Sequence, residues 1–404
     1  MIAHVSRWVL PVSRPPIRDG AVLVRGDEIQ AVGPARKVLS GFKGLICDHG
    51  SGVILPGLVN CHVHLEFSAL AGRIPPQERW EKWLETALAQ RETLAPAEID
   101  QGILQGIEAL RRSGAALVGE VSNTGASLPH LEKSLLKYHL FYECLGFDLR
   151  ERLDLAESFP FMAGSGAAAN SCVSAAAHAP YSVSPALFQA ISRWNKARSL
   201  PQTVHLGESR AERDFLATGR GFFQELLQRR GRWADDFQAP GPSPVAYLNK
   251  LDFLGPRTLA VHGVWLDKQD CALLAQSQTW LVLCPRANRY TGAGVPPVDR
   301  LLQAGVNLAL GTDSLAGNWD LNLFGEMRWL HRIFPAYPGD LWLRLGTLNG
   351  ARALGRDLDL GSLEPGKKAA LGFVPLPRAA EHFAENFWEE LFIAGSAGKF
   401  RWLA

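Results

Sequence analysis

The chain has 404 residues, 47% of them hydrophobic and 20% charged, with a formal net charge of +2. This length accommodates one barrel-sized domain plus a smaller one, and the composition is that of an ordinary globular protein. The near-neutral charge argues against nucleic acid and against an anionic membrane surface as partners. We therefore expect a small-molecule substrate, no nucleic-acid partner and no membrane partner.

The sequence also indicates the compartment. No apolar run reaches the length of a membrane span, and the residues from Met1 to Pro11 lack the layout of a signal peptide. The six cysteines are scattered and form no Cys-x-x-Cys pair, which favours reduced, buried thiols over a disulfide framework. These features predict a cytoplasmic protein, and Cys61 in particular is interpreted as a core thiol.

Both ends of the chain are rich in short strand patterns. Three brief apolar runs separated by turn residues lie near the N-terminus, at Val5–Leu10, Gly20–Arg25 and Glu28–Gly33. A comparable segment, Gly361–Val374, returns near the C-terminus. These patterns predict a small β-sandwich domain built from both termini, comprising residues 1–55 and 356–404.

Residues 56–355 alternate between short apolar runs and helical patterns. Strands that are apolar throughout belong to parallel sheets with both faces covered, and alternation with helices is typical of repeated βα units. Eight such units predict an α/β fold, a (β/α)8 TIM barrel, as the catalytic domain. The eight apolar runs are Gly57–Cys61, Ala116–Val121, His139–Leu145, Val173–Ala177, Gln202–Val204, Thr258–Val261, Thr279–Cys284 and Val306–Leu310.

The stretch from Gly52 to Leu65 contains the first candidate site. Its pattern indicates a strand, a Pro-Gly turn and a second short strand that leads into His62 and His64. Side chains two residues apart on a strand point to the same face, so the two imidazoles can meet at one point. Imidazole suits a divalent metal such as zinc, but two histidines cannot complete its site. We therefore expect further ligands at the ends of other strands.

In a (β/α)8 barrel the active site lies where the strands end at their carboxyl face. Five of the eleven histidines and one aspartate follow predicted strands, which scattered surface or core residues would not do. A single His-x-His arises by chance, and an aspartate alone can cap a helix, so the expectation rests on the joint pattern. The residues at the predicted strand ends are His62, His64, His178, His205, His262 and Asp313.

Two carboxylates add acid–base chemistry to this pattern. Glu208 follows His205 by three residues and can shuttle protons above a metal, whereas Asp313 can bind a metal and accept a proton from its water. Three or four ligands with one open position are the layout of a catalytic metal. Such a metal lowers the pKa of bound water to roughly 7. The sequence therefore predicts metal-assisted hydrolysis.

Seven segments of this chain, taken together, resemble the amidohydrolase superfamily and within it the aminohydrolase branch of deaminases and chlorohydrolases. The resemblance extends over nearly the whole chain. The segments are Ile54-Leu-Pro-Gly-Leu-Val-Asn-Cys-His-Val-His64, His178-Ala-Pro-Tyr-Ser-Val-Ser184, His205-Leu-Gly-Glu208, Val261-His262-Gly263, Cys284-Pro-Arg-Ala-Asn288, Gly311-Thr-Asp-Ser314 and Gly361-Ser-Leu-Glu-Pro-Gly366.

The resemblance assigns roles to the residues at the strand ends. It implies that Glu208 protonates a ring nitrogen of the substrate, and that His262, with Asp313, orients and deprotonates the attacking water. His178 in place of a carboxylated lysine implies a mononuclear site, with one divalent ion that we expect to be zinc, iron being the alternative. The implied metal ligands are His62, His64, His205 and Asp313.

Two motifs narrow the implied substrate. His178-Ala-Pro-Tyr181 resembles a segment of enzymes that deaminate adenosine-like nucleosides, and the stretches Cys284–Asn288 and Thr312–Leu321 resemble the aminodeoxyfutalosine group. We therefore expect a hydrolase of carbon–nitrogen bonds other than peptide bonds, a metal-dependent deaminase that releases ammonia from an adenine-type nucleoside with a modified 5′ side. Aminodeoxyfutalosine, and with it menaquinone biosynthesis, is the first expectation, followed by S-adenosylhomocysteine, methylthioadenosine and adenosine.

Departures from the family's pattern leave alternatives open. Leu65-Glu-Phe-Ser68 replaces the run that methylthioadenosine enzymes carry after their histidines, so the nucleoside is not fixed. A hydrolase of guanine, a pyrimidine, a triazine or a cyclic amide is the alternative enzyme, and a non-enzymatic barrel scaffold is the alternative class. Retention of all implied ligands, of Glu208 and of His262 speaks against the scaffold.

A further set of residues is expected to contact the substrate, and the helix around Trp80 is expected to line the pocket. Glu66 follows His64 by two residues and either contacts substrate or anchors a ligand histidine. Glu92 matches the position of a ribose-binding glutamate, its alternative being a solvated helix charge. Trp319 could stack on a base, its alternatives being a core role or a dimer contact, and we expect a homo-oligomer. The substrate-binding candidates are His178, Glu66, Glu92, Arg286, Asn288 and Trp319.

Overall fold

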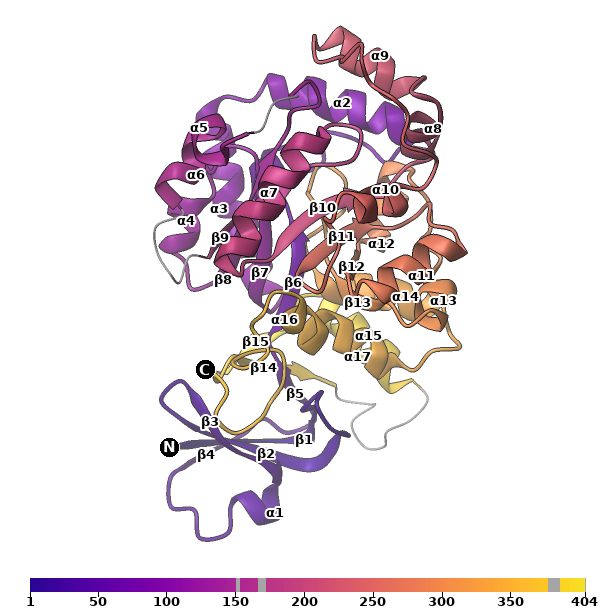
Figure 1. Cartoon of the computed structure of the whole chain (residues 1–404). Helices are drawn as coiled ribbons and strands as arrows, with labels where there is room; N and C mark the ends of the chain where they lie inside the picture. Colours follow the sequence, from indigo (N-terminus) through magenta and orange to yellow (C-terminus); the bar gives the residue numbers. More distant parts are fainter. Residues whose placement is uncertain (150–152, 166–171, 377–385, 404) are drawn as a thin grey trace. The chain divides into compact units, whose positions relative to one another are not determined.

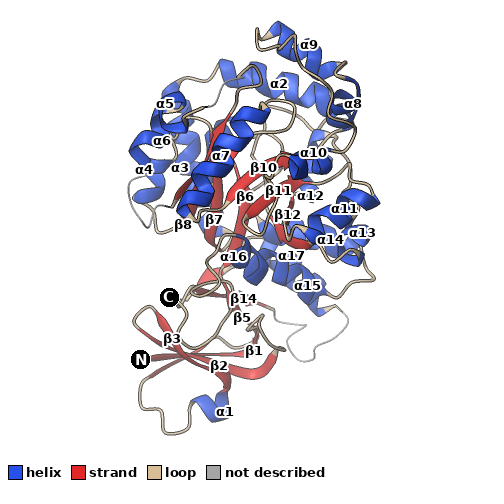
Figure 2. Cartoon of the chain, viewed as in Figure 1, coloured by secondary structure: helices blue, strands red, loops and turns tan. Residues whose placement is uncertain are grey.

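The structure is a computed structural model that describes residues 1–149, 153–165, 172–376 and 386–403. Its elements can be followed along the chain in Figure 1 and by type in Figure 2. The chain forms two compact units. The first comprises Met1–Cys61, Ile107–Val118 and Leu321–Ala404, and the second comprises His62–Gly106 and Gly119–Asp320.

The first unit contains a seven-stranded sheet drawn from both ends of the chain. The order is β15-β14-β5-β1-β2-β3, with β4 paired to β1. Strand β14 pairs antiparallel with β5, so a segment near the C-terminus extends a sheet begun by the N-terminal strands. Among the described residues of this unit the named strands form one sheet, so the expected sandwich of two sheets is not seen there. The strands are β1 (Ile2–Val9), β2 (Ile17–Arg25), β3 (Glu28–Pro34), β4 (Leu45–Asp48), β5 (Gly52–Pro56), β14 (Leu371–Pro375) and β15 (Arg401–Trp402).

Apolar side chains on these strands form the core of the sheet. Val9, Ile54, Leu371 and Phe373 are buried in one cluster. Branched and aromatic side chains favour strands, and burying each such side chain fully contributes about 1.5–3 kcal/mol. The helices of this unit are α1 (Ala35–Val38), α14 (Leu323–Ile333), α15 (Gly339–Arg344), the π-helical turn Leu345–Asn349, α16 (Gly350–Ala353) and α17 (Phe387–Ser396).

Eight strands, each within or overlapping one of the eight predicted apolar runs, carry the residues at the strand ends. They form two four-stranded sheets, ordered β6-β7-β8-β9 and β10-β11-β12-β13. The pairs from β10 to β13 and the pair β8–β9 are parallel. The strands are β6 (Leu58–Val63), β7 (Ala115–Ser122), β8 (Lys137–Cys144), β9 (Val173–Ala177), β10 (Gln202–Leu206), β11 (Thr258–His262), β12 (Trp280–Leu283) and β13 (Asn307–Leu310).

Backbone hydrogen bonds join the two sheets at both of their outer edges. At one edge, the His205 N–H donates to the carbonyl of His178 over 2.9 Å. At the other, the N–H groups of Thr312 and Asp313 donate to the carbonyl of His62 over 3.1 and 3.0 Å. These bonds lie at the carboxyl ends of the strands, and they bring the predicted site residues of both sheets to one end of the unit.

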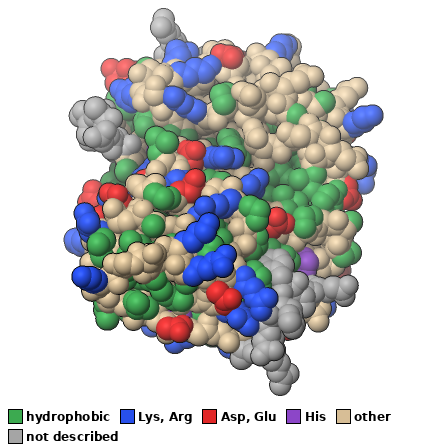
Figure 3. Space-filling view, turned by 90° about the horizontal axis from the view of Figure 1, so that it is seen from below, with side chains coloured by type: hydrophobic (Ala, Val, Ile, Leu, Met, Phe, Trp, Pro, Cys, Tyr) green, Lys and Arg blue, Asp and Glu red, His purple; other side chains and the backbone are tan. Residues whose placement is uncertain are grey.

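Helices lie around the strands of the second unit (Figure 2). In the described part of the chain, every helix falls short of the length and apolarity needed to cross a membrane. The charged side chains on the face of the molecule drawn in Figure 3 are of both signs, and acidic and basic ones are interspersed. The helices are the 3-10 helix η1 (Leu65–Leu70), α2 (Trp80–Glu92), α3 (Pro96–Arg112), α4 (Leu128–Glu132), α5 (Leu155–Ser158), α6 (Pro160–Ser165), α7 (Pro185–Arg198), α8 (Arg210–Thr218), α9 (Phe222–Arg229), α10 (Pro244–Lys250), α11 (Lys268–Gln276), α12 (Pro285–Thr291) and α13 (Val298–Gln303).

Candidate active site

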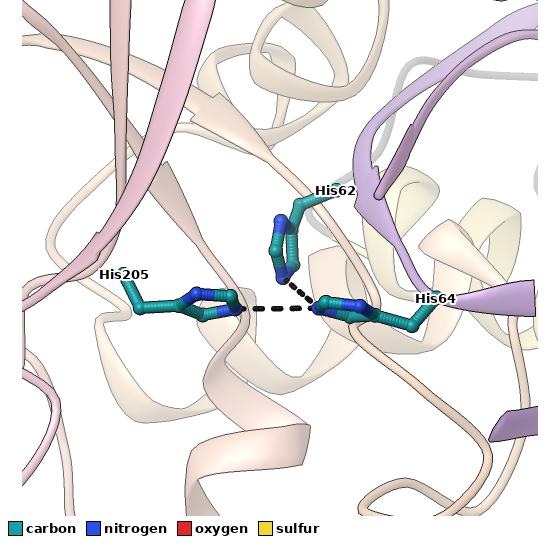
Figure 4. A group of neighbouring side chains, drawn as sticks. All are labelled: His62, His64 and His205. Atoms are coloured by element: carbon teal, nitrogen blue, oxygen red, sulfur yellow. Dashed lines mark hydrogen bonds between the residues drawn. The ribbon is translucent and has the colours of Figure 1, made fainter. Parts of the chain in front are cut away.

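Three buried histidines point their Nε2 atoms at one another (Figure 4). His62 lies within β6, His64 directly follows that strand, and His205 lies in β10. The His64 Nε2 atom is 3.1 Å from the His62 Nε2 atom and 3.2 Å from the His205 Nε2 atom. The alternation of side chains along β6 places the first two on one face, as the sequence predicts.

This arrangement fits a divalent metal ion. Three lone pairs cannot face one another without a proton or a cation between them. His205 donates its Nδ1–H to the carbonyl of His178 over 2.9 Å, which leaves its Nε2 as the coordinating atom. A tetrahedral ion about 2.0–2.1 Å from each nitrogen would hold the nitrogens about 3.3 Å apart, close to the observed separations. These three residues can therefore hold a metal ion.

The protonation of the three imidazoles supports this interpretation. Burial, followed by the neighbouring imidazoles, lowers the pKa of His62 well below its usual value, and burial lowers the pKa of His64 to about 3. Both are therefore neutral near pH 7. Burial also disfavours charge on His205, but neighbouring carboxylates outweigh burial and raise its pKa. A cation among the three nitrogens would replace that proton.

Asp313 brings a carboxylate to the same cluster. Its Oδ1 atom lies 3.8 Å from the Nε2 atoms of both His62 and His64. The residue has a φ of 57°, in the left-handed region, and its Oδ1 accepts the Ser314 N–H over 2.7 Å. Strained backbone of this kind persists where the surroundings enforce it, often at functional sites. Asp313 is therefore placed to supply a fourth ligand or to accept a proton.

His262 is held with one ring nitrogen directed to the acidic residues of the site. Its Nδ1 is 2.8 Å from the Asn288 Oδ1, so the imidazole donates there and leaves Nε2 as an acceptor. That Nε2 is 3.6 Å from the Glu208 Oε1. Burial lowers the pKa of His262 to about 4, so the ring is neutral and can accept a proton. Asn288, which the sequence analysis expects to bind substrate, accepts this hydrogen bond and so orients the histidine.

Glu208 is a buried carboxyl group fixed by its surroundings. Its Oε1 accepts the indole N–H of Trp80 over 2.8 Å. Glu212 accepts the N–H groups of Gly207 and Glu208 over 3.1 and 3.0 Å, which fixes the turn that follows His205. Burial raises the pKa of Glu208, so it holds a proton at a higher pH than a free glutamate does. This is the property required of a general acid.

A cavity of about 540 Å³ opens from these residues. Its polar lining includes His64, His205, Glu208, His262 and Asp313. Beyond them the wall is largely aromatic and aliphatic, and three arginines complete it. The apolar part of the lining includes Phe67, Trp80, Trp83, Leu88, Phe147, Tyr181, Phe223 and Leu227. The arginines are Arg91, Arg230 and Arg232.

His178, one of the predicted substrate-binding residues, lines the cavity, whereas three other candidates are not among its described lining residues. Glu92 has a 62% exposed side chain that pairs with Arg230 at 2.7 Å, as expected for a solvated helix charge. Arg286 makes two bonds of 2.8 and 2.9 Å to Asp320. Trp319 is 50% exposed, and its ring packs edge-on to Tyr290. The described residues that line the cavity include none of these three.

Glu66 is also absent from the described lining of the cavity. It is buried and accepts hydrogen bonds from the Ser122 and Thr124 hydroxyls and from backbone N–H groups that follow β7. Arg91 lies 3.6 Å from its Oε2. These contacts fix the loop after β7 next to the segment that carries His64, and none of those named reaches a ligand histidine.

Glu143 is a site residue that the sequence analysis did not identify. It lies near the end of β8, lines the cavity, and places its Oε1 3.3 Å from the His205 Nδ1. Its Oε2 accepts the Asn123 side-chain N–H over 2.6 Å. Burial opposes its charge, but three neighbouring imidazoles outweigh burial and lower the pKa of Glu143. The signal in the sequence was one acidic residue inside the apolar run His139–Leu145.

Comparison with known proteins agrees with this geometry. A model of the amidohydrolase family matches residues 53–391. A 5-methylthioadenosine/S-adenosylhomocysteine deaminase of Syntrophobacter fumaroxidans (strain DSM 10017 / MPOB) is 32% identical over 390 residues, which cover 87% of this chain and 79% of that protein.

Two solved structures share the fold. Helicobacter pylori aminofutalosine deaminase, crystallised with methylthio-coformycin, has a TM-score of 0.85 at 22% identity, with 99% of this chain and 100% of that chain covered. An adenosine deaminase from Xanthomonas campestris with bound Zn has a TM-score of 0.79 at 23% identity, with 99% and 90% covered. With the family match over most of its length, this chain belongs to the amidohydrolase family and is a hydrolase of carbon–nitrogen bonds other than peptide bonds.

Proposed function

We propose that this protein is a hydrolytic deaminase of an adenine-type nucleoside with a modified 5′ side. The observation that carries the proposal is one cavity whose lining includes two of the three converging histidines, His64 and His205, together with Glu208, His262 and Asp313. The names of the relatives support a 6-aminopurine nucleoside as the substrate class. We propose a single divalent ion at His62, His64, His205 and Asp313, and the zinc in one structural neighbour supports zinc as its identity.

The proposal extends to the architecture that carries the site. We infer that the eight strands close one (β/α)8 barrel, because hydrogen bonds join the two sheets at both outer edges. Residues 56–355 would form this catalytic domain, and residues 1–55 with 356–404 the small β domain. Active sites of such barrels lie at the carboxyl ends of the strands. In this chain His62, His64, His205 and His262 lie in the last residues of their strands or directly after them.

The chemistry follows from the protonation states of the side chains. A bound divalent ion supplies water that is acidic enough to be deprotonated near pH 7. Neutral His262 presents Nε2 as a base, and Asp313 offers a second acceptor beside it. Glu208, whose pKa is raised by burial, delivers a proton to the ring nitrogen next to the carbon under attack. The ring loses aromaticity there, and the amino group then leaves as ammonia after receiving protons from the same carboxyl group.

The shape of the cavity indicates how the rest of the substrate lies. An adenine ring placed against Glu208 and His262 leaves most of the 540 Å³ for the sugar and its 5′ arm. The apolar wall suits a thioether or an aromatic arm. Arg230 and Arg232 at the lining pair with Glu92 at 2.7 Å and with Asp148 at 3.3 Å, and a substrate arm that ends in a carboxylate can take the place of either partner. This favours aminodeoxyfutalosine first and S-adenosylhomocysteine next, ahead of the uncharged methylthioadenosine and adenosine.

A nucleoside panel tests the proposal. Ammonia release should give kcat/KM values for 5′-substituted adenine nucleosides at least about tenfold above those for adenine, guanine and cytosine, because only the former fill the apolar part of the cavity. Among the nucleosides, those with an acidic arm should be preferred. Turnover of guanine, cytosine or a triazine, with every adenosine derivative inert, would contradict the substrate assignment.

A further inference from the structure

Trp80 reaches from helix α2 to the carboxyl group that the proposed function makes the general acid. Its side chain is 3% exposed, and its indole N–H donates to the Glu208 Oε1 over 2.8 Å. The two residues are separated by 128 positions in the sequence. A buried carboxyl group that accepts a hydrogen bond from an equally buried indole is held in one orientation.

Aromatic packing fixes the indole itself. The Trp80 ring lies 5.8 Å from the Phe223 ring of α9 and 6.3 Å from the Tyr181 ring, measured between centroids. Tyr181 and Phe223 stack at 3.7 Å with an interplanar angle of 15°. The three rings therefore hold one another, and the indole cannot turn away from Glu208 without disturbing α9.

Ion pairs hold α9 beside α2 at the same place. Arg229 pairs with Glu85 at 2.8 Å, and Arg230 pairs with Glu92 at 2.7 Å. Exposed pairs of this kind contribute little to stability individually. Together with the ring packing, they keep the helix that carries Trp80 in register with the helix that packs against its indole.

The hydrogen bond from Trp80 makes the two carboxyl oxygens of Glu208 unequal as carriers of the proton. An indole nitrogen only donates, so the Oε1 that receives it must act as an acceptor. A protonated carboxyl group has a single O–H, and its carbonyl oxygen is the stronger acceptor, so the hydrogen bond to Oε1 favours the O–H on Oε2. Resting on the proposed function, we propose that Trp80 is a positioning residue for Glu208, which fixes the carboxyl plane and reserves Oε2 for the proton given to the substrate ring.

The competing explanation is that Trp80 serves only as a wall of the cavity, since it also lines that space. The two roles differ in what they change. A wall residue alters substrate and product binding, so its loss raises KM and the product inhibition constant together. A residue that orients the acid alters the reacting state, so its loss lowers kcat and leaves both binding constants nearly unchanged.

Two substitutions remove the N–H while retaining an aromatic ring. Trp80→Phe is the simple variant. In the second, benzothienylalanine replaces Trp80, so that sulfur takes the place of the indole N–H and the size of the ring system is kept. If the phenylalanine variant loses metal or unfolds, this second variant distinguishes the positioning role from the wall role. Trp194→Phe is the matched control, because the Trp194 indole nitrogen has no acceptor among the described residues.

Steady-state kinetics on the best nucleoside of the panel give the test. Both Trp80 variants should lower kcat about ten- to a hundredfold, with KM and the inhibition constant of the deaminated product within about threefold of the parent. Trp194→Phe should keep the parental kcat. Unchanged kcat with raised KM in the Trp80 variants would contradict this role alone. An inert parent protein would contradict the proposed function, and with it this role.

Discussion

Glu208→Gln is expected to abolish nearly all turnover while leaving the metal and the fold in place. A single proton transfer by a side chain contributes about 10²–10⁴-fold, and Glu208 serves several transfers in one turnover, so kcat should fall by more than this. The glutamine keeps the size of the side chain and can still accept the Trp80 N–H. The measurement is ammonia release together with metal content and the thermal unfolding midpoint.

A surface glutamate provides the matched control for this variant. Glu108→Gln removes a charge of the same kind from a side chain that is 54% exposed and is not among the described residues that line the cavity. Its kcat should fall by much less than that of Glu208→Gln, and its metal content should equal the parent's. If Glu208→Gln lost the metal along with activity, Glu208 would be a ligand rather than the acid, and the assignment of roles would be wrong.

Removal of the metal is expected to lower activity by a factor similar to that expected for Glu208→Gln. Protein purified without chelator should contain close to one divalent ion per chain, and His64→Ala should lose it, because the His64 Nε2 lies within 3.1–3.2 Å of both neighbouring Nε2 atoms. Activity should fall on the order of 10³-fold or more in the chelated protein. Added zinc should restore the chelated parent but not the variant, as judged by metal analysis and ammonia release.

Two outcomes would contradict the single-ion site. One is the recovery of two tightly bound ions per chain, which would require ligands beyond the four proposed. The other is full activity in protein that contains no metal. His139→Gln is a suitable control, because His139 is a buried histidine that bonds to Ser174 at 2.8 Å and is not one of the three converging residues. It should retain the ion.

The positions of the metal-ligating candidates were predictable because strand geometry is local. His62 and His64 are two residues apart on a strand, so their shared face follows from the sequence alone. His205, Glu208 and Asp313 follow apolar runs, and such runs in a βα alternation end at one face of the unit. The pairing of β14 with β5 was likewise foreshadowed by the strand pattern between Gly361 and Val374.

The substrate-contacting residues were less predictable because their orientation depends on tertiary contacts. Glu92 turns to Arg230, 138 residues away, and so lies on the surface. Arg286 of α12 forms hydrogen bonds with Asp320, which lies in the segment between β13 and α14. The position of a residue relative to a motif does not reveal its ion-pair partner. Which two residues pair depends on how segments that are far apart in the sequence pack together.

Trp80 and Glu143 belong to the site, but their hydrogen-bond and ion-pair partners could not be predicted from the sequence. The pattern of α2 indicates a helix, and its sequence allows Trp80 to face a pocket, but the bond to Glu208 depends on two segments 128 residues apart. Glu143 breaks the apolar run of its strand, which is a usable signal, because a buried carboxylate needs a partner. That partner, His205, is identified only when β8 and β10 are placed in space.

The central claim, hydrolytic deamination at a purine ring carbon, is tested most directly by a reaction in water enriched in oxygen-18. A 5′-substituted adenine nucleoside should yield one ammonia per product molecule, and the product should carry one oxygen-18 atom on the purine ring with its sugar still attached. Products with no label on the ring, or free adenine released by cleavage of the glycosidic bond, would contradict the account.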